Sequence, residues 1–150
     1  MELRAERYGS VVARPLTDAL AAELRERYGE DGPGGEPEPG VFAAPDGHFV
    51  VAVEQGRAVA CGGLARYDGR EGEIRRMYVD PEARGRGLSR AILSALEAAA
   101  RALGYEALRL ETGTGQPEAL GLYASAGYER IPPYGPYVND PHSVCFQKRL

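Results

Sequence analysis

Residues 84–89, with the sequence Arg-Gly-Arg-Gly-Leu-Ser, have the residue types of an anion-binding turn. The two glycines let the backbone turn sharply and approach a ligand without a Cβ in the way. A helix that begins here would direct its free N–H groups and the positive end of its dipole at whatever fills the turn. Arg84, Arg86 and Arg90 crowd that same end, where each cation is unfavourable by about 0.3–1 kcal/mol. A polyanion such as a pyrophosphate would relieve this conflict.

The composition of the chain offers a competing explanation for the same residues. The chain holds seventeen arginines and one lysine, so three arginines can fall close together without any function. A glycine-rich turn between a strand and a helix is also a weak signal when it stands alone. This segment by itself therefore leaves both readings open, an anion site and an ordinary turn.

The neighbouring elements place the segment between a strand and a helix. Residues 73–79 read as a strand, and residues 107–112 alternate apolar and charged side chains like another strand. Between them, apolar residues at helical spacing predict a helix that stops at Gly104: Leu88, Ile92, Ala95, Leu96, Ala99 and Leu103. Such a unit is a right-handed crossover between parallel strands, and ligands of open sheets bind at the carboxyl ends of these strands.

The remaining elements complete an α/β (α+β) fold with one sheet of seven strands. A first strand is predicted at residues 10–14, followed by a helix that Thr17 caps and Gly29 ends. Residues 48–54 and 57–67 form a hairpin about a tight turn. The chain then ends with a helix from Pro117 to Gly127, followed by strands at residues 128–131 and 143–148.

Glycine, proline and acidic residues fill residues 29–40, which can sustain neither a helix nor a strand. A mobile loop over a site and a tolerated insertion explain this composition equally well.

Length and composition indicate a single globular domain spanning residues 1–150. No apolar run approaches the ~20 residues of a membrane span, and four of the first seven residues are charged where a signal peptide needs an apolar segment. We therefore expect a cytoplasmic protein with no membrane partner. The two cysteines, Cys61 and Cys145, form no metal-binding spacing. The net charge of −4 argues against a general nucleic-acid binder.

Residues 74–89, Ile-Arg-Arg-Met-Tyr-Val-Asp-Pro-Glu-Ala-Arg-Gly-Arg-Gly-Leu-Ser, resemble the acetyl-CoA signature of the GNAT superfamily of N-acetyltransferases. This signature is a strand and then Arg or Gln, two residues, Gly, one residue, and Gly or Ala. Arg84 and Gly87 match it, whereas Ser89 replaces the usual Gly or Ala with another small residue. Residues 119–128 resemble the later helix of the family and the glycine-aromatic pair that follows it.

The resemblance extends to the element order of the whole chain. It implies a GNAT-like fold, with a central mixed, mostly antiparallel sheet of about seven strands flanked by helices. It also implies acetyl-CoA as co-substrate, an amine as acceptor and no metal. Assembly as a homodimer is left open.

Tyr123 in the later helix is the candidate acid that the resemblance implies. Members of the family use a tyrosine at this position to donate a proton to the departing thiolate of CoA. At neutral pH a phenol with a pKa of ~10 can donate its proton to a thiolate whose thiol has a pKa of ~8.5. Tyr123 also falls on the apolar face of its helix, so a purely structural place in the core is the alternative.

Two carboxylates compete for the role of base, which an amine acceptor needs because it is mostly protonated in water. Glu73 lies at the start of the strand that carries the cofactor. The resemblance aligns it with a glutamate that acts as the base in some family members. Glu111 lies at the end of the next strand. Either could act through a chain of water molecules, or could merely pair with the arginines at 75, 76 and 109. We favour Glu73 by a small margin.

The resemblance also implies how acetyl-CoA is bound. Main-chain groups near Met77 and Val79 are expected to pair with the pantetheine arm like an added strand, and an amide would polarise the thioester carbonyl. Gln116 stands where the family often has an asparagine, so its role is carried over only weakly. The expected contacts are Met77, Tyr78, Val79, Arg84, Gly85, Arg86, Gly87, Leu88, Ser89, Arg90 and Gln116.

The acceptor pocket is expected between the first helix, residues 29–40 and residues 132–139. Its candidate substrate-binding residues are Tyr28, Tyr134 and Tyr137. The last two lie beside prolines, so they could line a pocket or only pack the connection. An amino acid, a polyamine, an antibiotic and a protein amino terminus all stay open as acceptors.

We therefore predict an N-acetyltransferase that moves an acetyl group from acetyl-CoA to a primary amine of a small molecule by direct attack in a ternary complex. The alternatives are an acyl-CoA-binding or sensing module without activity, and an acetyltransferase that acts on protein amino termini or lysines.

Overall fold

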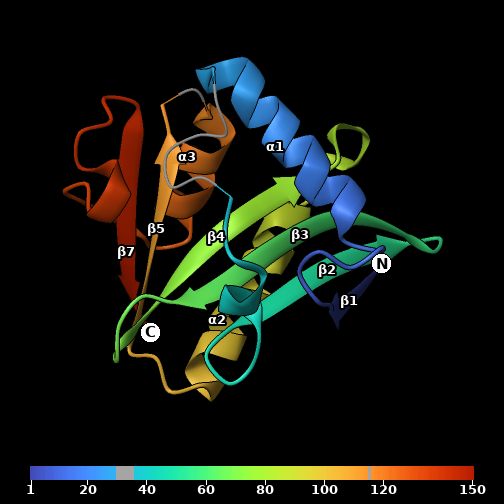
Figure 1. The fold of residues 1–150 in the computed structure, drawn as a ribbon, viewed down its shortest axis with the longest axis horizontal. Helices are drawn as coiled ribbons and strands as arrows, with labels where there is room; N and C mark the ends of the chain where they lie inside the picture. Colours follow the sequence, from blue (N-terminus) through green and yellow to red (C-terminus); the bar gives the residue numbers. More distant parts are fainter. Residues whose placement is uncertain (30–35, 115) are drawn as a thin grey trace.

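The computed structural model describes residues 1–29, 36–114 and 116–150, with the backbone alone at residue 28. Within these residues, seven strands form one sheet in the order β1-β2-β3-β4-β5-β7-β6 (Figure 1). The strands are β1 (Glu2–Ala5), β2 (His48–Glu54), β3 (Arg57–Arg66), β4 (Glu71–Val79), β5 (Ala107–Gly113), β6 (Glu129–Ile131) and β7 (Ser143–Arg149). The helices are α1 (Arg14–Tyr28), α2 (Leu88–Ala102) and α3 (Pro117–Ser125).

The predicted fold is confirmed, because every neighbouring pair of strands is antiparallel except β4 and β5. The hairpin of β2 and β3 closes through Gln55 and Gly56, which both have positive φ, as the tightest hairpin turns require. The β4-α2-β5 crossover joins the parallel pair as expected.

The first strand was misplaced by the sequence prediction. Residues 10–13 form turns, and the strand β1 is Glu2–Ala5, which pairs with β2 at the edge of the sheet. All four residues of β1 are exposed, so this strand lacks the alternation of buried and exposed residues that identifies a strand from sequence.

The start of α1 also differs from the prediction. The helix begins at Arg14 with Pro15 in its first turn, where the missing N–H of proline costs no hydrogen bond. Thr17 therefore lies inside the helix, and its hydroxyl donates to the carbonyl of Arg14 at 3.3 Å instead of capping. The predicted end is right, since Gly29 adopts a left-handed conformation and its N–H bonds the carbonyl of Arg25.

Two apolar layers hold the sheet between the helices. On one face α1 packs against β3 and β4, with Leu16, Leu20 and Phe49 in the core. On the other face α2 and α3 cover the sheet, and the α2 residues Ile92, Leu93 and Leu96 are almost fully buried (Figure 1). None of the helices within the described ranges is long and apolar enough to cross a membrane.

The sheet opens between its two parallel strands. β4 and β5 pair only from Glu71 opposite Ala107 to Ile74 opposite Leu110. Beyond this point β4 continues beside β3 as far as Val79, while the end of β5 continues beside β7. The two strands therefore diverge toward their carboxyl ends, and this divergence creates the site.

Candidate active site

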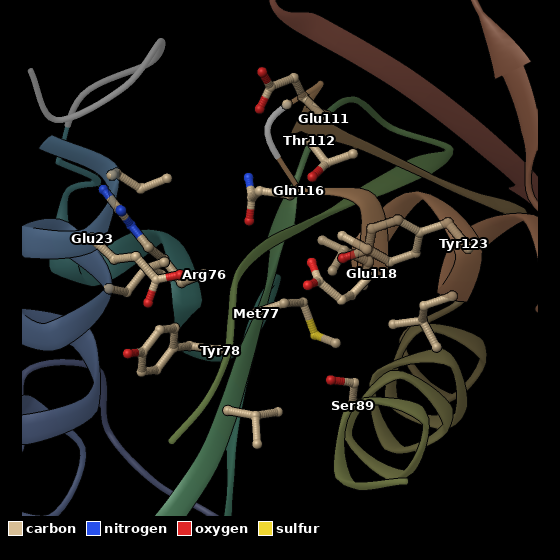
Figure 2. A pocket seen from close by; sticks show the side chains of 18 of the residues that line it. Glu23, Arg76, Met77, Tyr78, Ser89, Glu111, Thr112, Gln116, Glu118 and Tyr123 are labelled. Atoms are coloured by element: carbon tan, nitrogen blue, oxygen red, sulfur yellow. The ribbon is translucent and has the colours of Figure 1, made fainter. Parts of the chain in front are cut away.

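A cleft of about 580 Å³ lies where β4 and β5 diverge, and Figure 2 shows it with β4 between two walls. Helix α1 supplies one wall with Glu23, and α2 and α3 supply the other wall with Ser89 and Tyr123. The cleft therefore reaches both faces of the sheet. Its volume falls within the range of pockets that bury a small ligand.

The edge of β4 offers backbone hydrogen-bonding groups to this cleft. Residues 75–79 have no partner on β5, and Met77, Tyr78 and Val79 line the cleft, as the sequence predicted for a pantetheine contact. An extended ligand can pair with such an edge as an added strand.

A β-bulge bends this edge of β4. Tyr78 pairs with Cys61 and Arg75 with Gly63, so two residues of β4 oppose one residue of β3. The bulged residue Arg76 has a φ of 60°, a conformation that is uncommon outside glycine. Bulges of this kind re-aim side chains beside functional sites.

Gly62 lies on β3 opposite this bulge, where a Cβ would come within 2.7 Å of the Met77 sulfur and 2.6 Å of a methyl of Ile92. Glycine is therefore required for α2 and Met77 to approach the sheet this closely.

The N-terminus of α2 begins at the glycine turn where the sequence predicted an anion cradle. Gly85 and Gly87 have φ of 81° and 80°, and Gly87 occupies the N-cap position with no side chain capping the helix. Leu88, Ser89 and Arg90 follow it along the cleft. The first N–H groups of a fifteen-residue helix are thus left for a ligand, and together with the helix dipole they favour an anion.

The three arginines of the cradle have different surroundings. Arg84 lines the cleft and donates to the carbonyl of Val79 at 3.0 Å and to Glu23 of α1 at 3.2 Å. Arg90 lines it as well and donates to Ser125 at 2.6 Å. Arg86 instead donates to Glu54 at 2.6 Å, and it does not line this cleft.

Tyr123 is buried in α3 and its ring extends from the helix toward the cleft (Figure 2). The ring packs against Tyr128 and Phe146, with centroids 5.8 and 5.9 Å away. No hydrogen bond of its hydroxyl is found among the described residues. Burial, followed by the charge of Glu111, raises the pKa of Tyr123, so the phenol stays protonated at neutral pH and is available as a donor.

Glu111 lies on the cleft directly after Leu110, the last residue of β5 that pairs with β4. Burial raises the pKa of Glu111 to about 7, and the charges of Asp140 and Glu73 act in the same direction. The Ser143 hydroxyl donates to its carboxylate at 2.7 Å and lowers the pKa, as does the charge of Arg75. A carboxyl group with this pKa can both take and release a proton near neutral pH.

Glu73 has different surroundings and is not among the residues that line the cleft. Its carboxylate accepts a hydrogen bond from the hydroxyl of Tyr134 at 2.7 Å. The ring of Tyr134 in turn covers the guanidinium of Arg109, which lies between this ring at 4.7 Å and the ring of Tyr67 at 4.1 Å. Glu73 thus anchors residues 132–139 to the sheet.

The sequence named three arginines as partners for the two carboxylates. The structure gives two of them other partners, since Arg109 forms two hydrogen bonds with Glu71 at 2.9 and 3.0 Å, and Arg76 pairs with Glu36 at 3.3 Å. Neither Glu73 nor Glu111 forms an ion pair with an arginine within the described ranges. Glu71 could not be found from sequence, because only the register places it beside Arg109 and Gln147.

The candidate acceptor residues are brought together only in part. Tyr137 lines the cleft, whereas Tyr134 packs beneath it between Tyr67 and Tyr137. The side chain of Tyr28 and residues 30–35 lie outside the described residues. Gln116 lines the cleft at the start of α3. The structure adds lining residues for which the sequence gave no signal: Leu20, Glu23, Leu24, Arg75, Thr112, Asp140 and His142.

No group of three or more His, Cys, Asp or Glu side chains that could hold a metal ion is found in the part of the chain that the structure describes. Both cysteines are buried and unpaired.

Comparison with known proteins identifies relatives of this chain and structures with the same fold. A model of the acetyltransferase (GNAT) family matches residues 16–128. The chain is 43% identical over 110 residues to the IAA acetyltransferase of Azospirillum brasilense, covering 73% of this chain and 72% of that protein. It is 31% identical to a crystal structure from Klebsiella pneumoniae described as an acyl-CoA N-acyltransferase, with a TM-score of 0.83 over 99% of this chain and 97% of that one.

A third relative was crystallised with a ligand. The GNAT acetyltransferase of Elizabethkingia anophelis, solved with acetyl-CoA bound, has a TM-score of 0.71 at 16% identity and covers 99% of this chain and 97% of its own. The family model spans three quarters of the sequence, so the chain belongs to the GNAT family of acetyltransferases.

Proposed function

We propose that the protein transfers an acetyl group from acetyl-CoA to a primary amine of a small molecule, with both substrates bound together. Membership of an acetyltransferase family supports acetyl-CoA as the donor of the acetyl group. The Elizabethkingia anophelis protein, which has the same fold, was solved with acetyl-CoA bound. The observation that carries the proposal is the position of Glu111 and Tyr123 on one cleft, where the strands diverge.

In the proposed reaction, Glu111 accepts a proton from the ammonium form of the acceptor, directly or through water. The amine nitrogen then forms a bond to the thioester carbonyl carbon, and the carbon–sulfur bond breaks. Tyr123 donates its hydroxyl proton to the departing sulfur. The nitrogen of the new amide loses its second proton, which returns to the phenolate of Tyr123 directly or through water. Neither cysteine is available as a nucleophile, since Cys61 and Cys145 are buried and burial raises the pKa of both thiols.

We place the base at Glu111 rather than at Glu73, which the sequence favoured by a small margin. Two features support this choice: Glu111 lines the cleft and Glu73 does not, and the carboxylate of Glu73 accepts the hydrogen bond of Tyr134. The pKa of Glu111, raised to about 7 by burial, also suits a base that works at neutral pH.

The cradle at residues 85–90 supports binding of the pyrophosphate of CoA, through the N–H groups of α2 and the guanidinium groups of Arg84 and Arg90. The unpaired edge of β4 at Met77 and Val79 supports binding of the pantetheine arm.

The test is an assay of thiol release from acetyl-CoA in the presence of a panel of amines, with the acetylated amine identified by mass spectrometry. We expect thiol release that depends on the amine and is equal to the amount of acetylated product. The alternative is an acyl-CoA-binding module without activity, which shares the cradle but has no use for Tyr123 or Glu111. Tight binding of acetyl-CoA with no turnover of any amine would favour that module.

A further inference from the structure

Arg75 occupies a distinctive position at the inner end of the cleft. It directly follows Ile74, the last residue of β4 that pairs with β5, just as Glu111 directly follows Leu110 on β5. The two charged residues therefore stand side by side where the strands diverge, and both line the cleft. The charge of Arg75 lowers the pKa of Glu111 and that of Tyr137, so its guanidinium is close to both.

Arg75 differs from Arg76 and Arg109 because no partner for its side chain is found among the described residues. It is half-buried, yet no hydrogen bond or ion pair of its guanidinium is found within the described ranges. Arg109, by contrast, is held by Glu71 and two tyrosine rings. Arginine presents a fork of donors that matches a carboxylate, and a half-buried guanidinium without an anion is a costly arrangement.

The pyrophosphate of CoA is too far away to be that anion. Its proposed cradle begins beyond Val79, and at ~3.3 Å per residue the strand places Arg75 about 13 Å before that residue. Arg75 lies instead at the end of the cleft where Glu111 is found, which is the end proposed for the acceptor.

We propose that the acceptor carries a carboxylate next to its amine, as an amino acid does, and that Arg75 binds this carboxylate while Glu111 faces the amine. Arg75 and Glu111 carry opposite charges at neighbouring strand positions and form no ion pair with each other within the described ranges. An amino acid presents a carboxylate that matches Arg75 and an ammonium group that matches Glu111. The inference rests on the proposed function and adds the substrate class to it.

The other acceptor classes fit this pair of charges less well. A polyamine or an aminoglycoside brings further cations, which Arg75 would repel. The amino terminus of a protein has an amide in place of the neighbouring carboxylate, so Arg75 would remain without an anion. The charge of Arg75 is therefore a specificity determinant that favours free amino acids over these amines.

The test compares amino acids with their own carboxamides. Purified protein and acetyl-CoA are assayed with glycine, methionine, phenylalanine, glutamate and lysine, each beside its carboxamide, and with putrescine and kanamycin. Because the amine of a carboxamide is the more acidic, the decisive quantity is the ratio of kcat/KM for acid and amide, compared between the wild type and Arg75→Met. We expect the substitution to lower this ratio by about tenfold or more, through KM for the acid.

Two further variants test whether the effect depends on the positive charge at position 75. Arg75→Lys retains the charge and should restore part of the preference, whereas Arg4→Met removes one positive charge from the exposed strand β1 and should leave the ratio unchanged. An equal loss for acid and amide in Arg75→Met would overturn the inference, because it would mean that Arg75 acts only on Glu111 or on stability. A preference for putrescine or kanamycin in the wild type would overturn it as well.

A binding measurement separates failure of this inference from failure of the proposed function. Calorimetry in the presence of CoA measures the affinity for N-acetylmethionine and for its carboxamide. If no amine is turned over, the proposed function fails. Tighter binding of the acid that is lost in Arg75→Met would still support a carboxylate site, and equal binding of the two ligands would remove it.

Discussion

Glu73 and Glu111 are carboxylates on the same face of the sheet, and their surroundings separate their roles. The carboxylate of Glu73 is engaged by Tyr134, which also covers Arg109. Glu111 is held by Ser143 and open to the cleft, in an environment that raises its pKa to about 7. We therefore expect Glu73 to position residues 132–139 and Glu111 to exchange the proton.

Replacing Glu111 by glutamine tests the proposed base. For the wild type, kcat/KM should rise through about pH 7, because the carboxyl group must lose its proton before it can accept one from the amine. In Glu111→Gln this rise should disappear, and activity at neutral pH should fall by about 10²-fold or more. Glu73→Gln is the matched control. It should keep the rise but move it to lower pH, because the charge of Glu73 helps to raise the pKa of Glu111. An unchanged rise in Glu111→Gln would assign the base elsewhere.

Replacing Tyr123 by phenylalanine tests the proposed acid. The ring contacts with Tyr128 and Phe146 should persist, and no hydrogen bond of the hydroxyl is found among the described residues, so stability should change little. Turnover should fall about tenfold or more, since proton donation to the leaving group contributes at least that much, while the affinity for acetyl-CoA is retained. The measurements are steady-state kinetics and calorimetry. Normal turnover would leave Tyr123 with only a role in core packing.

At the scale of elements, the proposed donor site combines the N-terminus of α2 with the edge of β4. Gly87 ends the turn in a left-handed conformation and leaves the helix uncapped, while the bulge at Arg76 bends the strand that leads to it. The cradle is thus made chiefly of backbone groups, with arginine side chains around it. The backbone of this turn has positive φ at Gly85 and Gly87, so its shape depends on the glycines and not on the arginine side chains.

Arg84 and Arg86 form a matched pair for testing this element. Alanine in place of both should weaken the binding of CoA, and the structure assigns most of that loss to Arg84, which lines the cleft. We expect about a fivefold loss of affinity for Arg84→Ala, the effect of one partly exposed charge contact, and a smaller loss for Arg86→Ala, whose side chain pairs with Glu54. Calorimetry with CoA at low and high salt measures both. An equal effect of the two variants would contradict the assigned positions.

At the scale of the whole molecule, the sheet consists of two parts with a narrow connection. Strands β1 to β4 form one part and β5 to β7 the other, and the two are joined by the pairs from Glu71–Ala107 to Ile74–Leu110 alone. A ligand that enters between β4 and β5 would restore the missing pairing beyond Ile74. Binding should therefore stabilise the molecule across this connection as well as at the cradle.

Hydrogen exchange with and without CoA measures this coupling. CoA should slow the exchange of amides at residues 75–79 of β4 and 111–113 of β5, and at a hundredfold excess over its Kd it should stabilise the fold by about 3 kcal/mol. ADP has the pyrophosphate but no pantetheine arm, so it should protect the start of α2 and leave the β4 edge unprotected. A rise in Tm with CoA but without protection of residues 75–79 would show that the arm binds elsewhere.

The sequence by itself determined the family, the crossover and the glycine turn before α2, because each depends on residues that are neighbours along the chain. Apolar residues at helical spacing predicted α2, the glycines of residues 84–89 predicted the turn before it, and the GNAT resemblance is confirmed by the family model. It failed for β1, whose four exposed residues form an edge strand through pairing with β2 alone.

Only the tertiary structure decided how the charged residues of the site are paired. Glu71 and Arg109, Glu73 and Tyr134, and Glu111 and Ser143 are all more than thirty residues apart in the chain. Their pairing depends on strand register, which brings distant side chains onto one face, and on burial, which sets the pKa of Glu111. For the same reason Arg75 became distinctive only in the fold: the sequence shows an arginine among many, and the end of β4–β5 pairing leaves it facing the cleft without a partner in the described residues.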